Sequence, residues 1–387
     1  MRILIAPDSF KESLSALEVA TAIEKGFKAV LPNAEYLKVP MADGGEGTAL
    51  AVLAATAGTC QKVKVKGPLE EEVDSFFGLT GDGKTAIIEM AAASGLELVK
   101  VEKRNPLLTT SFGTGQLIKA ALDLGVRHLV LGLGGSATND AGAGLLMALG
   151  VRLLDQEGNL IAPTGAGLAK LSAIDLTDLD PRLKDCVLEI ACDVDNPLTG
   201  PKGASYTFGP QKGASQEQVM LLDANLKHFA QIVRQSLGLD MENLKGAGAA
   251  GGMGGALWAF LGGKLRSGLS IVAEVVGLYE KIAKADLVIT GEGRLDAQTL
   301  HGKTPAGIAR IAAEYKVPVL ALGGSLSDDA DQVLGTSGFA AIQSAVARPC
   351  ELKEALKSAK LNLEKAAQRA AHLLCLGAQL KSKLDES

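Results

Sequence analysis

Three loops of this chain combine small residues with an acid or a lysine, and each follows an apolar stretch and precedes a helix-forming stretch. They cover residues 6–13, 132–140 and 291–304. A helix that begins at such a loop leaves backbone N–H groups free to bind an anion. Carboxylates beside an anion site can hold a divalent cation or accept a proton. This combination predicts phosphoryl transfer to a small molecule.

The first loop carries Asp8, Ser9, Lys11 and Ser13 directly after the apolar residues 2–6. Open parallel sheets bind ligands at the carboxyl ends of their strands, which is where this loop is expected. Lys11 can neutralise phosphate charge, and Asp8 can hold Mg²⁺ or accept a proton. The two serines are candidate substrate ligands. The alternative is that the loop only caps the helix that follows.

Asp43 and Glu46 flank a pair of glycines after the second expected strand. Divalent cations such as Mg²⁺ prefer carboxylate oxygens and water as ligands, so these acids are candidate metal ligands. The alternative is an ordinary turn whose acids interact favourably with the start of the next helix.

The loop at 132–140 is the most glycine-rich of the three. Its backbone amides can wrap a phosphate, and hydroxyl groups add further donors. The candidate nucleotide ligands are Gly134, Gly135, Ser136, Thr138 and Asn139.

The third loop is expected to place Glu292, Arg294 and Asp296 after a strand over 286–290. Lys303 lies just before the next helix, where an anion can bind. The Gly-Lys-Thr sequence around Lys303 resembles the end of a Walker A loop, but alanine occupies the position that needs the first glycine. Lys303 therefore stays a candidate anion ligand outside that motif.

Two further segments carry candidate residues. Asp193 follows a strand over 186–191 and is a candidate metal ligand or base, although Asp-Asn-Pro sequences also form plain turns. Gly248 and Gly251 belong to a Gly-x-Gly-x-x-Gly pattern, but the residues before it are polar and form no expected strand. These glycines fit close packing or close approach to a ligand better than nicotinamide binding.

The elements that position these loops alternate between strand and helix at both chain ends. A capping box formed by Ser15 and Glu18 predicts a helix from there to about residue 31, and one long helix is expected over 352–374. Short strands in the middle of the chain indicate a mixed sheet. The strands expected at the two ends cover residues 2–6, 34–39, 286–290, 318–322 and 339–343.

The fold class predicted is α/β with two domains. Residues 1–60 and 286–387 are expected to form a flavodoxin-like or Rossmann-like doubly wound domain with a parallel sheet. Residues 61–285 are expected to form an inserted mixed α/β domain.

Composition excludes several classes of protein. The net charge is −5 without a basic tract, which argues against a nucleic-acid partner. No apolar run is long enough to cross a membrane, and the five cysteines lack the spacing of zinc sites. The expected location is the cytoplasm.

Six segments together resemble the bacterial type-1 glycerate kinase family, the glycerate 2-kinases. The resemblance implies ATP-dependent phosphorylation of D-glycerate with Mg²⁺, on the 2-hydroxyl to give 2-phosphoglycerate and ADP. Some members are described as producers of 3-phosphoglycerate. It also implies an inserted domain resembling restriction endonucleases. The segments are 6–14, 40–48, 132–142, 192–198, 246–252 and 290–296.

The residue chemistry agrees with this resemblance. Lys11 and Arg294 can bind the glycerate anion, with Glu292 and the two serines nearby. Asp8, Asp43 or Asp193 can supply Mg²⁺ ligands, and Asp296 or Asp193 is the candidate base. Closure of two domains can exclude water, and a homodimer is compatible with the sequence. The rival functions are a nicotinamide-dependent hydroxy-acid oxidoreductase and a non-catalytic binding protein for organic acids.

Overall fold

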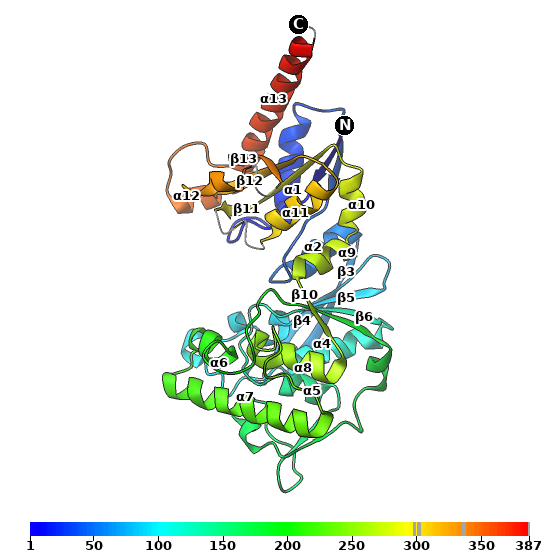
Figure 1. Ribbon diagram of the computed structural model, residues 1–387, viewed down its shortest axis with the longest axis vertical. Coiled ribbons are helices and arrows are strands. Elements are labelled where there is room, and N and C mark those ends of the chain that lie inside the picture. The colour runs from blue at the N-terminus through cyan, green and yellow to red at the C-terminus, as the bar shows by residue number, and fades with distance from the viewer. Residues whose placement is uncertain (297–298, 300–302, 335–337, 386–387) are drawn as a thin grey trace. The chain divides into compact units, whose positions relative to one another are not determined.

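The computed structural model describes residues 1–296, 299, 303–334 and 338–385. Residues 297–298 and 300–302 of the third loop lie outside the described residues. Contacts divide the chain into two compact units (Figure 1): unit 1 is Met1–Asp43 with Val272–Ser387, and unit 2 is Gly44–Ile271. The domain limits expected from the sequence, 1–60 with 286–387 and 61–285, remain a prediction.

Unit 1 is built on a parallel sheet whose strands come from both ends of the chain, as predicted. The strand order is β13-β12-β11-β1-β2. The strands are β1 (Arg2–Ile5), β2 (Glu35–Lys38), β11 (Leu287–Leu295), β12 (Val319–Leu326) and β13 (Phe339–Ser344). The connection after β1 leads to β2 on one side, and the later strands add on the other side. The gap between β1 and β11 is therefore the topological switch point, where open α/β sheets bind ligands.

The helices of unit 1 pack on this sheet through an apolar core that includes Ile23, Phe27 and Leu363. Hydrogen bonds between Ser15 and Glu18 form the predicted capping box at the start of α1. Gly26 lets α1 touch α13, because a Cβ there would lie 2.3 Å from the main-chain oxygen of Glu364. The helices are α1 (Ala16–Lys28), α10 (Leu278–Ala283), α11 (Thr304–Glu314), α12 (Leu352–Lys357) and α13 (Ala359–Asp385).

Two local predictions for unit 1 were wrong. The single helix expected over 352–374 is two helices, because the chain leaves helical geometry at Ser358, where φ is −101° and ψ is 8°. Glu292 and Arg294 lie within β11 rather than in the loop after it. That strand continues to Leu295 because it stays paired with β12, with Glu292 opposite Gly323 and Arg294 opposite Ser325.

Unit 2 contains the mixed sheet that the sequence indicated, in the order β10-β9-β6-β5-β4-β3. The β3–β4 and β4–β5 pairs are antiparallel, and the other pairs are parallel. The strands are β3 (Thr59–Lys66), β4 (Glu72–Leu79), β5 (Thr85–Glu89), β6 (His128–Gly132), β9 (Val187–Ala191) and β10 (Lys264–Arg266), with a separate hairpin of β7 (Arg152–Leu154) and β8 (Ala173–Asp175).

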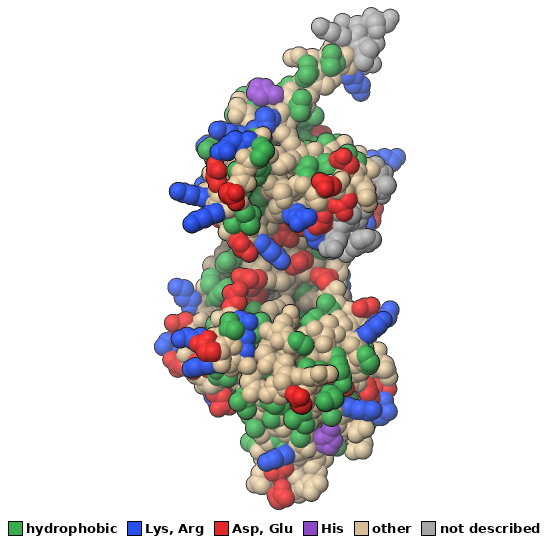
Figure 2. Space-filling model, turned by 90° about the vertical axis from the view of Figure 1, so that its left-hand side faces the viewer, with side chains coloured by type: hydrophobic (Ala, Val, Ile, Leu, Met, Phe, Trp, Pro, Cys, Tyr) green, Lys and Arg blue, Asp and Glu red, His purple; other side chains and the backbone are tan. Residues whose placement is uncertain are grey.

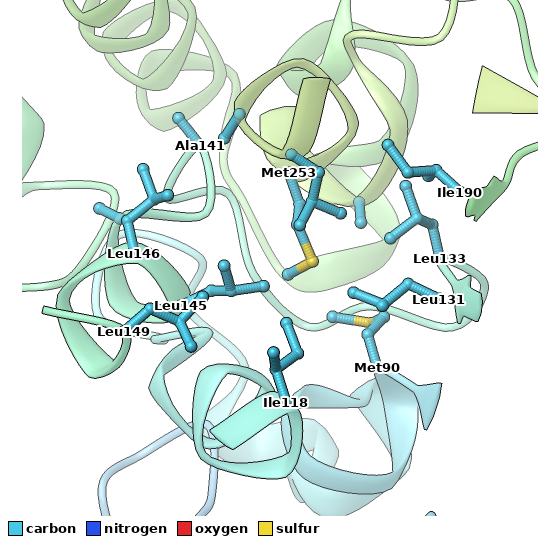
Figure 3. Close-up of a cluster of buried hydrophobic side chains, with 14 of the residues drawn as sticks. Met90, Ile118, Leu131, Leu133, Ala141, Leu145, Leu146, Leu149, Ile190 and Met253 are labelled. Atoms are coloured by element: carbon cyan, nitrogen blue, oxygen red, sulfur yellow. The ribbon is translucent and has the colours of Figure 1, made fainter. Parts of the chain in front are cut away.

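Unit 2 has its own apolar core, in which side chains from the sheet and several helices point toward one another (Figure 3). Leu131 on β6 and Ile118, Leu145 and Met253 on three helices are fully buried there. This packing holds the end of β6, from which the glycine-rich loop starts. The helices are α2 (Thr48–Thr56), α3 (Ala91–Ser94), α4 (Phe112–Asp123), α5 (Ala143–Ala148), α6 (Ala204–Phe208), α7 (Gln216–Leu237) and α8 (Met253–Leu261), with α9 (Gly268–Val275) crossing the unit boundary.

Short 3₁₀ helices connect several of these elements. They are η1 (Leu96–Leu98), η2 (Val101–Lys103), η3 (Gly167–Lys170), η4 (Pro181–Asp185), η5 (Pro210–Lys212), η6 (Ala249–Gly252) and η8 (Ala330–Val333).

The surface carries both signs of charge. On the face drawn in Figure 2, basic and acidic side chains are interspersed on each unit. Within the described ranges, none of the helices combines the length and the apolar composition that a membrane crossing requires.

Candidate active site

Asp8 lies at the switch point of the unit 1 sheet. Its backbone N–H donates to the carbonyl oxygen of Gly291, 2.9 Å away, which ties the loop after β1 to β11. Its carboxylate accepts hydrogen bonds from the Ser9 N–H at 2.6 Å and from the Thr304 hydroxyl at 2.7 Å. Burial raises the pKa of Asp8, and the negative charge of Asp43 raises it further against the effect of the Thr304 bond. Asp8 is therefore a partly buried carboxyl whose negative charge a nearby cation would stabilise.

Glu292 faces the same site from β11. Its side chain is 14% exposed, and its carboxylate accepts a hydrogen bond of 2.7 Å from the Thr299 hydroxyl. The Lys303 ammonium lies 3.7 Å from the other carboxylate oxygen. Burial raises the pKa of Glu292 to about 7. The effect of burial is larger than the opposing effects of the Thr299 hydrogen bond and the Lys303 charge, which lower the pKa. A carboxyl with this pKa can exchange a proton near neutral pH.

Asp296 behaves differently from Glu292 although the two share a neighbour. Its carboxylate lies 3.2 Å from the Lys303 ammonium and accepts the Thr299 N–H at 3.0 Å. Burial raises the pKa of Asp296, but the hydrogen bond and charge of Lys303 outweigh it and hold the pKa below its usual range. Asp296 is thus an ionised partner of Lys303 at neutral pH.

The other unit 1 candidates surround this cluster. Lys11 and Arg294 are exposed, and the Arg294 guanidinium lies 4.0 Å from the Asp296 carboxylate. Asp43, beyond the end of β2, is exposed and acts electrostatically on Asp8. The Ser13 hydroxyl donates to the carbonyl oxygen of Phe10 at 3.0 Å, so it closes the loop turn in this structure.

In unit 2, the glycine-rich loop has an exposed tip and a buried base. Gly134 and Gly135 are exposed, whereas Ser136, Thr138 and Asn139 are buried. Helix α5 begins only at Ala143 and has six residues, so the loop does not open directly into a long helix. The exposed tip is the part of this loop that can meet a ligand.

Lys212 contacts the buried base of the glycine-rich loop, and the sequence analysis did not identify it. Its side chain is 2% exposed, and its ammonium donates hydrogen bonds of 2.7 Å to the Ser136 hydroxyl and to the Thr138 carbonyl oxygen. Burial lowers the pKa of Lys212 to about 7. The sequence around Lys212 gave no sign that this lysine is buried, because an exposed lysine in a turn after a proline would have the same local sequence.

The base of the loop holds further polar groups. The Asp140 carboxylate accepts bonds from the Ser111 N–H and hydroxyl and from the Gly142 and Gly144 N–H groups. Burial raises the pKa of Asp140, and these four donors oppose that rise. Of the described side-chain atoms that are buried, Thr138 Oγ1 and Asn139 Oδ1 have no hydrogen-bond partner.

Three further acids of unit 2 lie outside the glycine-rich loop. The Asp193 carboxylate accepts the N–H of Gly268, the first residue of α9, at 3.3 Å. Glu46 is exposed. Glu89, which sequence reasoning passed over, accepts the N–H groups of Gly47 and Ala49 at the start of α2.

Gly248 and Gly251 are buried. A Cβ at Gly251 would lie 2.2 Å from the Thr138 carbonyl oxygen, and one at Gly248 would lie 2.3 Å from the Pro197 carbonyl oxygen. Close packing was one of the explanations that the sequence left open for these glycines. In the structure, no strand comes directly before the Gly-x-Gly-x-x-Gly pattern. The context needed for nicotinamide binding is therefore lacking.

The metal candidates do not form a closed cage. No group of three or more His, Cys, Asp or Glu residues suited to a metal ion occurs among the described residues. Mg²⁺ in phosphoryl-transfer enzymes often takes only one or two carboxylates, with substrate phosphates and water completing its coordination.

Comparison with known proteins shows the family of this chain. The model of the glycerate kinase family matches residues 3–375. Glycerate 2-kinase of Escherichia coli K12 is 53% identical over 97% of this chain and 99% of its own length, and glycerate kinase of Bacillus subtilis 168 is 54% identical over 96% and 97%. A crystal structure assigned as glycerate kinase 2 of Salmonella typhimurium LT2 covers 98% of this chain and 99% of its own, with a TM-score of 0.91 and 54% identity.

These similarities extend over nearly the whole chain, and they confirm the resemblance seen in the sequence. The protein is a kinase, and the oxidoreductase alternative is set aside. The chain belongs to the glycerate kinase family.

Proposed function

We propose that this kinase transfers the γ-phosphoryl group of ATP to the 2-hydroxyl of D-glycerate, giving 2-phosphoglycerate and ADP, with Mg²⁺ as the metal. The name of the Escherichia coli relative, glycerate 2-kinase, supports the 2-position. The alternative product is 3-phosphoglycerate.

One observation carries the proposal: carboxylates and a lysine gather at the switch point of the unit 1 sheet. Asp8 follows β1, Glu292 lies on β11, and Lys303 precedes α11. Phosphoryl transfer needs positioning and charge stabilisation more than covalent chemistry, and these groups supply both signs of charge.

Glu292 is the base that the chemistry favours for the acceptor hydroxyl. Its pKa of about 7 means that the carboxylate is substantially ionised at neutral pH yet binds a proton readily. Asp296 has a lowered pKa and an ion pair with Lys303, so it is a weaker proton acceptor. Asp193 stays a candidate base or metal ligand in unit 2.

The groups around Asp8 fit a magnesium–nucleotide complex. Asp8 is partly buried and its pKa is raised in part by the charge of Asp43, so a cation beside the two would relieve their repulsion. Asp8 and Asp43 would hold Mg²⁺ directly or through water, and Glu46 remains a further candidate. The ion would neutralise phosphate charge during transfer.

The cationic side chains are proposed to bind the anionic substrates. Lys303 lies before the N-terminus of α11 and is suited to a phosphate. Lys11 and Arg294 are exposed and suited to the glycerate carboxylate, with Ser9 and Ser13 as further polar contacts. The exposed glycine tip of unit 2 is proposed to contact phosphate oxygens through its amides.

The decisive experiment is a coupled ADP-release assay with D-glycerate, L-glycerate, glycerol and hydroxypyruvate. The product is then identified by ³¹P NMR. We expect turnover with D-glycerate alone and a phosphate on the 2-oxygen. A phosphate on the 3-oxygen would change the proposed product but leave the kinase activity standing. Turnover of glycerol without turnover of glycerate would contradict D-glycerate as the acceptor.

We also propose that the protein forms a homodimer. Light scattering of the same sample measures its oligomeric state.

A further inference from the structure

A small pocket of about 110 Å³ lies at the carboxyl edge of the unit 1 sheet. Its sheet-side wall comes from the ends of three neighbouring strands: Gly293 on β11, Gly324 on β12 and Val346 just after β13. The facing wall comes from α12 and the first turns of α13, which lie beside this end of the sheet (Figure 1). Of its lining residues, only Lys11 and Ser13, on the loop after β1, have a role proposed above.

The pocket walls are largely apolar. Leu352, Ala355, Leu356 and Ala359 line the helical side. Glycines line the sheet side and leave the backbone close to any occupant; a Cβ at Gly324 would itself lie 2.4 Å from the Gly293 carbonyl oxygen. A small pocket with apolar walls favours an uncharged ring, which gains free energy by leaving water.

Asn362 on α13 adds a polar group to the lining. No described residue forms a hydrogen bond with its side-chain amide, which therefore keeps both a donor and an acceptor. The adenine edge presents a donor beside an acceptor, and a carboxamide pairs with both at once. On the edge that carries N7, guanine presents two acceptors, N7 and O6, and matches a carboxamide less well.

The pocket borders residues next to the switch point of the sheet. Lys11 and Gly293 line the pocket, and Gly293 directly follows Glu292. Because neighbouring strands are about 4.8 Å apart, the edge from β13 to β1 spans about 15 Å. A nucleotide lying along that edge would place its base in the pocket and its phosphates at the switch point.

Of the two substrates of the proposed reaction, only ATP carries a ring with apolar faces. Glycerate is a short hydroxylated anion that would lose hydration against these walls without compensation. We propose that this pocket binds the adenine ring of ATP, and that Asn362 selects adenine over guanine. This inference rests on the proposed function, since it assigns the nucleotide of that reaction to unit 1.

The test uses the full-length enzyme with Ala355→Leu, which fills the pocket with a helix-compatible side chain. Ala378→Leu on the exposed part of α13 is the matched control. We expect Ala355→Leu to weaken ADP binding, measured by calorimetry, at least tenfold and to raise the KM for ATP by a similar factor. The KM for D-glycerate and the affinity for tripolyphosphate should change less than twofold.

Asn362→Leu provides a second, independent measurement. It should reduce the preference for ADP over GDP by about tenfold, while circular dichroism shows that the fold is retained. Equal ADP affinity in wild type, Ala355→Leu and Ala378→Leu would overturn the proposal. A raised KM for glycerate with unchanged ADP binding would assign the pocket to the acceptor and overturn it equally.

The two proposals fail separately. If the wild-type enzyme bound ADP but did not phosphorylate glycerate, the proposed acceptor would be wrong and the calorimetry would still decide the pocket. If glycerate turned over normally in Ala355→Leu, the reaction would stand and the pocket assignment would fall.

Discussion

Replacing Glu292 with glutamine is expected to stabilise the folded enzyme at alkaline pH while it removes most of the activity. The carboxyl group is nearly as large as the amide, so the packing around Thr299 and Lys303 is largely preserved. Glutamine cannot ionise, so the change removes the titration of residue 292, whose pKa the tertiary structure has raised.

The magnitude follows from the shift in pKa. The pKa rises from an ordinary value of 4.5 to about 7 on folding, and each pKa unit corresponds to about 1.4 kcal/mol. Between pH 4.5 and 7 the folded Glu292 retains a proton that the unfolded chain has released. The stability of the wild type therefore falls by about 3 kcal/mol as pH rises through this interval, and then levels off.

Glutamine does not titrate, so Glu292→Gln should escape this loss. Relative to wild type, its free energy of unfolding should be about 3 kcal/mol higher at pH 8 and nearly unchanged at pH 4.5. Glu314→Gln, on the exposed end of α11, is the matched control and should show no such pH dependence. The turnover number of Glu292→Gln should fall by about 100-fold or more if the carboxylate accepts the hydroxyl proton.

Urea unfolding at several pH values measures the stability difference. Trp258, the only tryptophan, lies on α8 in unit 2, so its fluorescence reports on that unit. Hydrogen exchange of β11 reports on unit 1, where the effect should appear, and far-UV circular dichroism follows the whole chain. A stability difference that does not vary with pH, or full activity in the variant, would refute the reasoning.

Three further variants test other parts of the site. Asp8→Asn should lower turnover at least tenfold and raise the Mg²⁺ concentration needed for half-maximal rate, since it removes an anionic ligand; an unchanged Mg²⁺ titration would exclude that role. Lys212→Met should destabilise unit 2 by about 2 kcal/mol, because it leaves buried hydrogen-bond acceptors without a donor. Trp258 fluorescence during unfolding measures this loss. Lys264→Met, at an exposed position, is the control and should have little effect. Asp193→Asn should lower turnover at least tenfold, because this acid is proposed to act in the reaction. Normal turnover, with the free energy of unfolding lowered by less than about 1 kcal/mol, would show that the carboxylate only accepts the hydrogen bond at the start of α9.

Much of the unit 1 fold could be predicted from short-range patterns. The buried run before Asp8 predicted β1, and the Ser15–Glu18 capping box predicted the start of α1 within a residue. The alternation of strand and helix at both chain ends predicted a parallel sheet shared by the two ends. These features depend on neighbouring residues, so the local sequence contains the information.

The boundaries of some elements could not be found in this way. β11 extends to Leu295 because it pairs with β12, and the single helix expected at 352–374 breaks at Ser358. In both cases a partner or a local backbone geometry overrode the propensity of the segment.

The sequence by itself determined the family, the class of fold and the loops that carry acids and lysines. The tertiary structure decided how the acids differ: Glu292 has a raised pKa and Asp296 a lowered one, although both lie near Lys303. It also buried Lys212 beneath a loop 76 residues away in sequence. The physical reason is that burial and electrostatic potential are sums over groups from distant segments, and no local pattern encodes such a sum.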